Sequence, residues 1–445
     1  MLTGTNLKYT KAYNYRIVLE TIRLHGPFSR AEIARGTSLT AQTVSNIVSE
    51  LMEAGLVVEH GKRQEGRGAP ATTLKTNPDS AFSIGLDFNR DHLTGVLLDF
   101  SGAVRRRVHH DLDLLAPDEA LDRMADAAET LIADHDAARD TILGVGIGFP
   151  GPLDISEGNV AHSVVSPKKF AGWDHVPVAR TLQERLSLPV FLENNATAAA
   201  IGERWYGAGQ EIDTFFYLYF GAGLGGGAVI DGAPFDGHSG NAGELGYLPA
   251  LSGGANGGAN GSTNDGAPQG NGHAPANGSA FPSPAAPVTH AGERFHLPTL
   301  YRALQEAGFE AAVPADLAAI YETGPPPLLR AWLDAAGREL SHLMLSVEYL
   351  IDPEAVFFGG RLPDAIINDI LDQLRETLPQ LRPVRKLTTP RLLKATAGLD
   401  AAVLGVATLP LYEFFSPAPH LLLKRQREHR ESSTASPSTL FSARS

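Results

Sequence analysis

From Phe82 onward, short apolar runs alternate along the chain with longer segments whose apolar residues recur every three to four positions. The short runs predict buried strands, and the longer segments predict helices that bury one face. This alternation, with Gly-rich turns after the strands, is typical of an α/β architecture. The predicted strands read FSIGLDF, LTGVLLDF, ILGVGIGFP, PVFLEN, FFYLYFGAG, GGAVIDG and AVFFGG, and later helices read LPTLYRALQEAG and LLRAWLDAAGRELSHLMLSVEYLID.

The α/β pattern is interrupted at residues 248–292, which hold one charged residue, Asp265, among repeated Gly, Asn, Ala and Pro. Such a composition buries too little apolar surface to offset the entropy lost on ordering, so it predicts a disordered insertion. A flexible insertion without function is favoured over a binding segment. The polar, Ser-rich segment 416–445 is predicted to be a disordered tail, and an inert tail is favoured over one that contacts DNA.

Two short helices are predicted before the α/β region. Ser29 and Glu32 form an S-x-x-E capping box that starts the first helix. Thr40 caps the second, and Gly55 is placed to end it. Val44, Ile47, Val48 and Leu51 fall on one apolar stripe of this second helix. The pair with its short turn predicts a helix-turn-helix.

Polar side chains on the second helix suit the reading of DNA bases. Gln42, Thr43, Asn46 and Ser49 lie off the apolar stripe, and Gln and Asn can each bond adenine bidentately in the major groove. The alternative, an ordinary solvated face, is less favoured because LVVEHGK and ATTLKTN flank a turn and predict the wing of a winged helix. The predicted DNA contacts are Ser29, Arg30, Thr40, Gln42, Thr43, Asn46, Arg63 and Arg67, with Lys8, Lys11, Arg16, Lys62 and Lys75 as further phosphate contacts.

Charge and composition refine this picture. The 445 residues carry 37 Lys+Arg and 50 Asp+Glu, a net charge of −13, but residues 1–77 alone carry +4 and the remainder −17. The acidic average therefore does not argue against DNA binding by the first part. Zero cysteines exclude disulfides and thiolate chemistry. No run approaches 18 consecutive apolar residues and no apolar signal core begins the chain, so a cytoplasmic protein without a membrane partner is predicted.

Four motifs resemble the ROK family of repressors, open reading frames and sugar kinases: GVGIGFPGP at 144–152, LENNATAAAIGE at 192–203, FGAGLGGGAVIDG at 220–232 and AGELGY at 242–247. The resemblance implies a two-lobed, actin-like and ribonuclease-H-like α/β domain with a sugar cleft. It predicts a winged helix-turn-helix at residues 1–77 and a ROK domain at 78–415. This order is that of the family's sugar-responsive transcriptional regulators.

The resemblance also indicates lost kinase activity. The family's Glu-Asn-Asp motif, whose Asp is the general base, reads Glu193-Asn194-Asn195 here, and an amide cannot accept the proton. The first phosphate loop reads Asp87-Phe88-Asn89-Arg90 without the family's glycines. A degenerate nucleotide loop remains at Gly221, Gly223, Gly225 and Gly226, with Gly359 and Gly360 as a second turn, and tight turns inherited with the fold are the favoured explanation. Their G-x-G-x-x-G spacing lacks the βαβ context of a Rossmann site.

The resemblance assigns sugar binding to Asn194, Asn195 and Glu244, with Trp173 either lining the pocket or, as favoured, packing in the core. The family's zinc-linked His is Tyr247 here, and no cysteine follows it, so neither metal nor cofactor is predicted. The predicted function is a homodimeric or homotetrameric transcriptional regulator, by family a repressor, that binds double-stranded operator DNA and a carbohydrate effector. The alternatives are a sugar kinase with an appended head and a regulator that has lost its sugar response.

Overall fold

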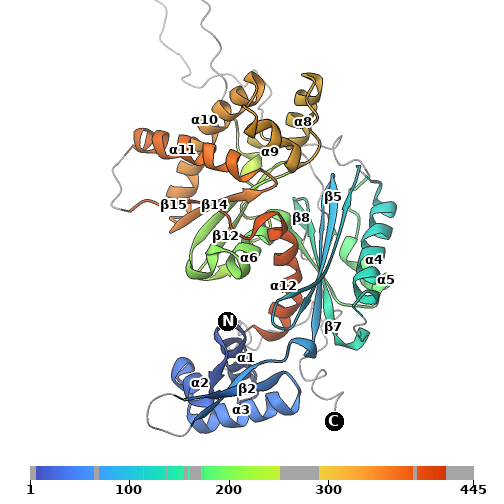
Figure 1. Ribbon diagram of the computed structural model, residues 1–445, viewed down its shortest axis with the longest axis vertical. Coiled ribbons are helices and arrows are strands. Elements are labelled where there is room, and N and C mark those ends of the chain that lie inside the picture. Colours follow the sequence, from blue (N-terminus) through green and yellow to red (C-terminus); the bar gives the residue numbers. More distant parts are fainter. Residues whose placement is uncertain are drawn as a thin grey trace, which may run out of the picture.

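The computed structural model describes residues 7–64, 70–113, 115–135, 138–154, 159–160, 172–173, 175–250, 290–383 and 388–416. Figure 1 shows a small head at one end of the molecule and two α/β lobes above it. The insertion predicted at 248–292 lies outside the described residues except at its ends, where Pro249 and His290 form a β-bridge. Arg67 and the predicted tail, apart from Ser416, also lie outside them.

The head is a winged helix-turn-helix, as predicted. The capping box of Ser29 and Glu32 is formed, and the Thr40 side chain accepts a hydrogen bond from the Thr43 amide. The four stripe residues of the second predicted helix are buried. Its elements are α1 (Leu7–His25), β1 (Phe28–Ser29), α2 (Arg30–Thr37), α3 (Ala41–Glu53), β2 (Val57–Arg63) and β3 (Ala71–Thr76), with the strands in the order β1-β3-β2.

The first lobe is a five-stranded sheet in the order β10-β7-β4-β5-β6. Strands β4, β5 and β6 form an antiparallel meander, and β7 and β10 add in parallel on the other side. Figure 1 shows α4 and α5 on the outer face of this sheet. The elements are η1 (Pro78–Ser80), β4 (Phe82–Phe88), β5 (His92–Asp99), β6 (Val104–Asp111), α4 (Pro117–Ala133), β7 (Ile142–Phe149), β8 (Leu153–Asp154), β9 (Asn159–Val160), α5 (Val178–Leu186) and β10 (Val190–Asn194).

The second lobe repeats the same strand topology in the order β13-β12-β11-β14-β15, with three antiparallel strands followed by two parallel ones. This repeated sheet confirms the predicted two-lobed, ribonuclease-H-like domain. Its elements are β11 (Phe215–Phe220), β12 (Leu224–Ile230), β13 (Ala233–Pro234), η5 (Leu245–Tyr247), α7 (Ala291–Arg294), α8 (Leu297–Glu306), α9 (Pro314–Glu322), α10 (Pro327–Leu350), β14 (Ala355–Gly360), α11 (Asp364–Leu381) and β15 (Arg391–Lys394).

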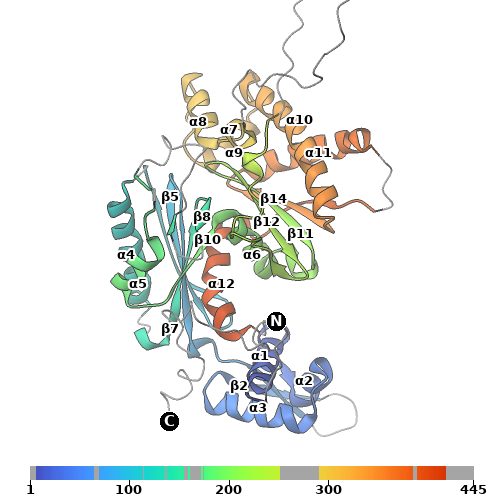
Figure 2. The ribbon, with the colours of Figure 1, turned by 180° about the vertical axis from the view of Figure 1, so that it is seen from behind.

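Two helices, α6 (Asn195–Tyr206) and α12 (Ala401–Phe415), lie between the sheets (Figure 2). Helix α12 packs on β4 and β7 of the first lobe, α6 packs on β11 and β12 of the second, and the two helices pack on each other. Glycines allow this close approach: a Cβ on any of them would lie within 2.4 Å of a backbone oxygen. These glycines are Gly85 of β4, Gly146 of β7, Gly202 of α6 and Gly405 of α12.

The segment Gly398–Phe415, which contains α12, has the length and apolar composition of a membrane span, and 61% of it is buried inside the fold. Its hydrophobicity therefore matches its place between the two sheets. Ser83 of β4 donates a buried hydrogen bond of 2.6 Å to the Ala407 carbonyl, which fixes α12 on the first sheet.

The head shares its hydrophobic core with the first lobe. Val18, Leu19 and Ile22 of α1 belong to one buried cluster with Phe100 and with Phe415 of α12. The segment that joins the head to the first lobe is also fixed in place, because the Phe100 amide donates a hydrogen bond to the Pro78 carbonyl in η1. The head is thus docked on the body through a continuous apolar contact.

Substituting Gly405→Ala tests the close helix pair. Its new Cβ would lie 1.8 Å from the Ala198 carbonyl oxygen, so the helices must separate. We expect a loss of about 1 to 3 kcal/mol in the free energy of unfolding, measured by chemical denaturation. Gly36→Ala in α2 is the control, because a Cβ there meets nothing within 4 Å and should change stability by less than about 1 kcal/mol. Equal effects of the two substitutions would contradict the close packing.

Candidate functional site

One half of the site is built where the first turn of α6 meets a segment of the second lobe. Asn194 caps α6, because its Oδ1 accepts a hydrogen bond from the Ala196 amide, and its Nδ2 donates to Glu244 Oε1 at 3.1 Å. Gly151, just after β7, lies against both: a Cβ there would be 2.2 Å from Glu244 Oε1 and 2.4 Å from Asn194 Nδ2. The structure therefore brings Asn194 and Glu244, 50 residues apart, into direct contact.

The other half involves Asn195, the first residue of α6. Its Nδ2 donates to Asp87 Oδ1 at 2.6 Å and to the Phe88 carbonyl at 3.2 Å. This pairing fixes the amide orientation, since only the NH₂ group can donate to a carboxylate and a carbonyl. The Oδ1 of Asn195 is buried and has no hydrogen-bond partner in the described part of the chain. Buried acceptors usually have a hydrogen-bond partner, so this unpaired oxygen is an unusual feature of the site.

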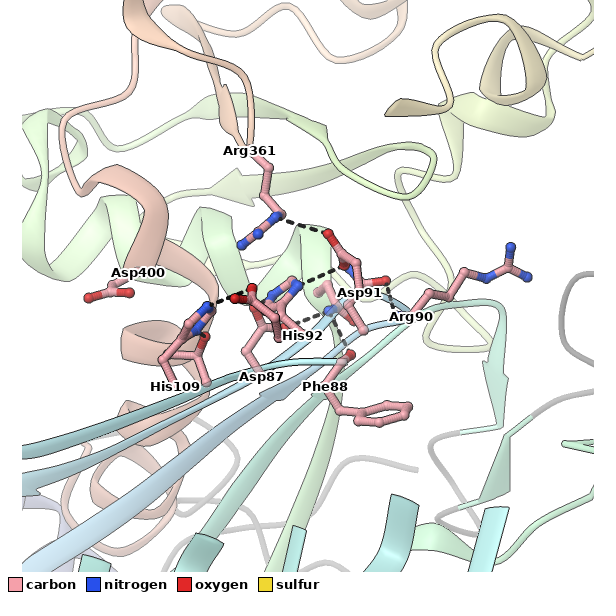
Figure 3. A network of polar contacts seen from close by, with 12 residues as sticks. Asp87, Phe88, Arg90, Asp91, His92, His109, Arg361 and Asp400 are labelled. Carbon is pink, nitrogen blue, oxygen red and sulfur yellow. Dashed lines mark hydrogen bonds and ion pairs between the residues drawn. The ribbon is translucent and has the colours of Figure 1, made fainter. Parts of the chain in front are cut away.

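Asp87 belongs to a buried polar network that crosses between the lobes (Figure 3). The His92 ring lies 3.3 Å from Asp87 through Nε2 and 2.8 Å from Asp91 through Nδ1. Asp91 in turn pairs at 3.3 Å with Arg361, which follows β14 in the second lobe. We call Asp87, His92, Asp91 and Arg361 the inter-lobe network. Asp87, Asp91 and His92 lie at or beside the turn between β4 and β5, where the ROK resemblance places the first phosphate loop.

The network holds balanced charges. Burial lowers the pKa of His92, but hydrogen bonds to Asp87 and Asp91 outweigh burial and raise that pKa to about 9. Burial alone would raise the pKa of Asp91, yet the hydrogen bond from His92 and the charge of Arg361 lower it. At neutral pH two cations therefore face two carboxylates, and little net positive charge is left to attract a phosphate.

Carboxyl groups near Asn194 have raised pKa values, whereas the pKa of Asp91 is lowered. Burial raises the pKa of Glu244 to about 7. Burial and the charge of Asp236 raise the pKa of Glu193 to about 8, while burial also raises the pKa of Asp236. A partly protonated carboxyl group can both donate and accept hydrogen bonds, which suits the vicinal hydroxyls of a neutral sugar.

Gly221 and Gly223 lie in the turn of the hairpin between the antiparallel strands β11 and β12, and Gly225 and Gly226 lie in β12. The arrangement bears out the rejection of a Rossmann site, because no helix starts at these glycines. Leu297 at the start of α8 donates to the Gly221 carbonyl, and a Cβ on Gly221 would contact the Tyr219 ring. Gly360 has a φ of 98° and lies against the Phe220 carbonyl oxygen. Both turns therefore have structural reasons for their glycines.

The head presents several of the predicted DNA contacts together. Gln42 and Asn46 are exposed one turn apart on α3 and bond each other at 2.9 Å, with Thr40 and Thr43 at the start of the same helix. Both views show α3 at the end of the head remote from the lobes (Figures 1 and 2).

Other predicted DNA contacts are engaged within the protein. Ser29 is buried, and its hydroxyl serves the capping box. Arg16 donates to the Glu413 and Ser416 carbonyls at the end of α12 and so cannot serve as the predicted phosphate contact in this arrangement. Arg63 on the wing pairs with Glu32, and Arg30 lies half-buried beside Met52.

Sequence reasoning missed His92, Asp91, Arg361 and Gly151. No spacing rule connects them, because Asp91 and Arg361 lie 270 residues apart. The one local signal is His92, a titratable side chain directly before the predicted strand LTGVLLDF. Trp173 packs between Phe88 and Phe149, which agrees with the favoured core assignment. Among the described residues, no group of three or more His, Cys, Asp or Glu has the geometry to hold a metal ion.

The fold and the two-part architecture define the class: a winged helix joined to a two-lobed ribonuclease-H-like domain. Residues 83–264 match the ROK family, and residues 13–68 match the MarR family. The xylose repressor of Bacillus spizizenii is 31% identical over 240 residues, which are 54% of this chain and 61% of that repressor. The chain thus carries a region that matches the ROK family, preceded by a MarR-like winged helix, and the match spans about six tenths of that repressor's length.

Solved structures agree on the fold. A crystal structure of a ROK family transcriptional regulator, a homologue of the E. coli MLC protein, has a TM-score of 0.65 at 22% identity, covering 91% of this chain and 97% of that one. A ROK hexokinase from Thermus thermophilus has a TM-score of 0.52 at 25% identity, covering 75% of this chain and 98% of the hexokinase. The hexokinase therefore leaves about a quarter of this chain uncovered.

Substituting His92→Gln tests the charge of the inter-lobe network. The folded pKa of about 9 exceeds the usual 6.5, so the stabilisation from protonated His92 is complete below pH 6.5 and is lost as the pH rises through 9. The free energy of unfolding of the wild type should therefore exceed that of H92Q most at pH 6. The difference should shrink by on the order of 2 to 3 kcal/mol by pH 10.

Chemical denaturation at pH 6, 8 and 10 measures this difference. His110→Gln is the control, because His110 is exposed on β6 and its removal should leave stability nearly unchanged at each pH. A difference between wild type and H92Q that stays constant or grows with pH would show that His92 is not held protonated.

Proposed function

We propose that this protein is a DNA-binding transcriptional regulator, by family a repressor of carbohydrate uptake or catabolism genes, whose ROK domain binds a sugar effector. The proposal rests on a winged helix with exposed Gln42 and Asn46, docked on a ROK domain in which an amide, Asn195, stands at the position where the family resemblance predicts the base. The similarity to a xylose repressor supports both the DNA and the sugar assignments.

The proposed DNA-contact surface consists of Thr40, Gln42, Thr43 and Asn46, with Arg30 and Arg63 as phosphate contacts. Ser29 is left out because it is buried, and Arg67 stays a prediction outside the described residues. Helix α3 would enter the major groove with its N-terminal half, where neutral amides can bond base edges. A homodimer or homotetramer would present two such helices to a near-palindromic operator.

The sugar-contact surface consists of Asn194, Asn195 and Glu244, with Asn195 Oδ1 as an acceptor and Glu244 beside it as a carboxyl of raised pKa. These groups bond hydroxyls and carry no cation for a phosphate. A neutral carbohydrate is therefore the favoured effector.

Phosphoryl transfer is not supported by the same groups. Asn195 holds its NH₂ toward Asp87, and a carboxylate in its place would face the Asp87 carboxylate at a separation near the present 2.6 Å. Two carboxylates so close repel each other unless one is protonated. Arg361, next to the second glycine turn, is already paired with Asp91. The two cations of the inter-lobe network, Arg361 and His92, are therefore held in internal pairs.

Substituting Asn46→Ala tests the DNA assignment. Anisotropy titration of labelled DNA from upstream of the protein's own gene should show salt-sensitive binding by the wild type. N46A should weaken specific binding by about 10- to 100-fold, since a bidentate base contact contributes about 1 to 3 kcal/mol, and leave binding to unrelated DNA unchanged. Ser49→Ala is the control on the same helix, because the Ser49 hydroxyl bonds the Ser45 carbonyl. Equal affinities for N46A and wild type would refute this reading of α3.

Substituting Asn195→Ala tests the sugar assignment. In a thermal-shift screen with D-xylose, D-glucose, N-acetyl-D-glucosamine and their phosphates, at least one neutral sugar should stabilise the wild type, by about 2.7 kcal/mol at a hundredfold excess over Kd. N195A should lose this stabilisation, and Gln380→Ala on the exposed face of α11 should keep it. Neither protein should release ADP from ATP with the bound sugar. Sugar-dependent ADP release by the wild type would favour the kinase alternative.

A further inference from the structure

Helix α6 reaches from the candidate sugar site to the head. Its first turn carries Asn194 and Asn195, which contact Glu244 and Asp87 at the cleft. Its last turn carries Trp205, whose ring lies under the guanidinium of Arg23 from α1, with 4.2 Å between the guanidinium carbon and the ring centroid. One rigid helix of 12 residues thus touches both functional surfaces.

The Arg23 side chain is held firmly in this position. It makes two hydrogen bonds to Glu20, of 2.8 and 2.9 Å, and only 7% of it is exposed. A guanidinium that is planar, paired on its edge and stacked on its face has little freedom to reorient. A movement of Trp205 must therefore either carry Arg23 with it or break the stack.

Helix α12 supplies a parallel connection. Its backbone contacts α6 closely at Gly202 and Gly405, so neither helix can shift against the other without losing this packing. Its C-terminal end accepts two hydrogen bonds from Arg16, of 3.1 Å to Glu413 and 2.9 Å to Ser416. Basic groups are favoured at this position because the last carbonyls of a helix are unpaired acceptors.

Both connections end on the same helix of the head. Arg16 and Arg23 lie two turns apart on α1, and between them Val18, Leu19 and Ile22 contact the core shared with the body. Helix α1 packs on α2 and α3, so the orientation of α1 sets the orientation of the DNA-reading helix. The path from the cleft to α3 is therefore a series of direct contacts.

We propose that the α6–α12 pair transmits the state of the sugar cleft to the head, and that the Arg23–Trp205 stack and the Arg16 bonds to α12 are the coupling contacts. This inference rests on the proposed function, because it specifies how that function is regulated. A ligand that closes the lobes on Asn194 and Asn195 shifts the start of α6, and the end of α6 moves α1 and with it α3.

The absence of cysteine from the chain allows a direct test by electron-resonance distance measurement. Spin labels are attached at E59C on the wing and D118C on α4, both exposed positions. The measurement is made on the full chain with and without the neutral sugars of the screen. Trp205→Ala and Arg23→Met remove the stack from opposite sides, and Trp205→Phe retains an aromatic face as the conservative control.

The wild type should give one narrow distance distribution without sugar and a shifted one with a stabilising sugar. W205A and R23M should at least double the width of the distribution without sugar, and the sugar-induced shift should disappear while sugar binding itself changes less than twofold. W205F should behave like the wild type. Thermal melting shows whether W205A or R23M fails to fold. If one of them does, the distance distribution of the other tests the coupling contacts.

The outcomes separate this inference from the proposed function. If W205A and R23M keep a narrow distribution, or keep the sugar-induced shift, the coupling contacts are assigned wrongly even though DNA and sugar are bound. If no neutral sugar binds and no upstream DNA is bound, the proposed function fails. In that case a widened distribution in W205A would still show that the stack holds the head, and an unchanged one would overturn the inference as well.

Discussion

The rest of the structure depends on one constraint, the close backbone contact of α12 with β4, β7 and α6. Its backbone lies against β4, β7 and α6 at positions where the sequence provides Gly85, Gly146, Gly202 and Gly405. A side chain at any of these positions would push apart layers that are packed at native density. Because α12 also ends at the head, this single helix sets both the spacing between the two lobes and the position of the head.

The candidate site lies where the first turn of α6 meets residues of both lobes. In a phosphoryl-transfer enzyme, positive groups and a free base must face the nucleotide and the attacking hydroxyl. Here Arg361 and His92 are neutralised by Asp91 and Asp87, and Asp87 also receives the amide of Asn195. The other polar groups at this place are the Asn195 acceptor and the Asn194–Glu244 pair, which the proposed function assigns to sugar binding.

Local patterns in the sequence predicted much of this. The capping box of Ser29 and Glu32, the buried stripe of α3 and the predicted strands of the two sheets depend on neighbours a few residues apart, where periodicity is informative. The edge strands β6, β13 and β15 were not among the predicted strands. The prediction that Asn195 replaces the family's base comes from the family resemblance alone. The Asp91–Arg361 and Arg23–Trp205 contacts were not predictable, because each joins residues far apart in sequence through packing that no local pattern encodes. For the same reason Arg16 was assigned to DNA, whereas it binds the end of α12.

The central claim is that ligand binding in the ROK domain alters DNA binding by the head. It is tested most directly by titrating the full chain into labelled upstream DNA at one fixed salt concentration, with and without a saturating neutral sugar chosen by thermal shift. The account predicts that the sugar changes the Kd for DNA by about 5- to 150-fold, the range usual for coupled sites, with no change for unrelated DNA. The same Kd with and without a sugar that demonstrably binds would contradict it.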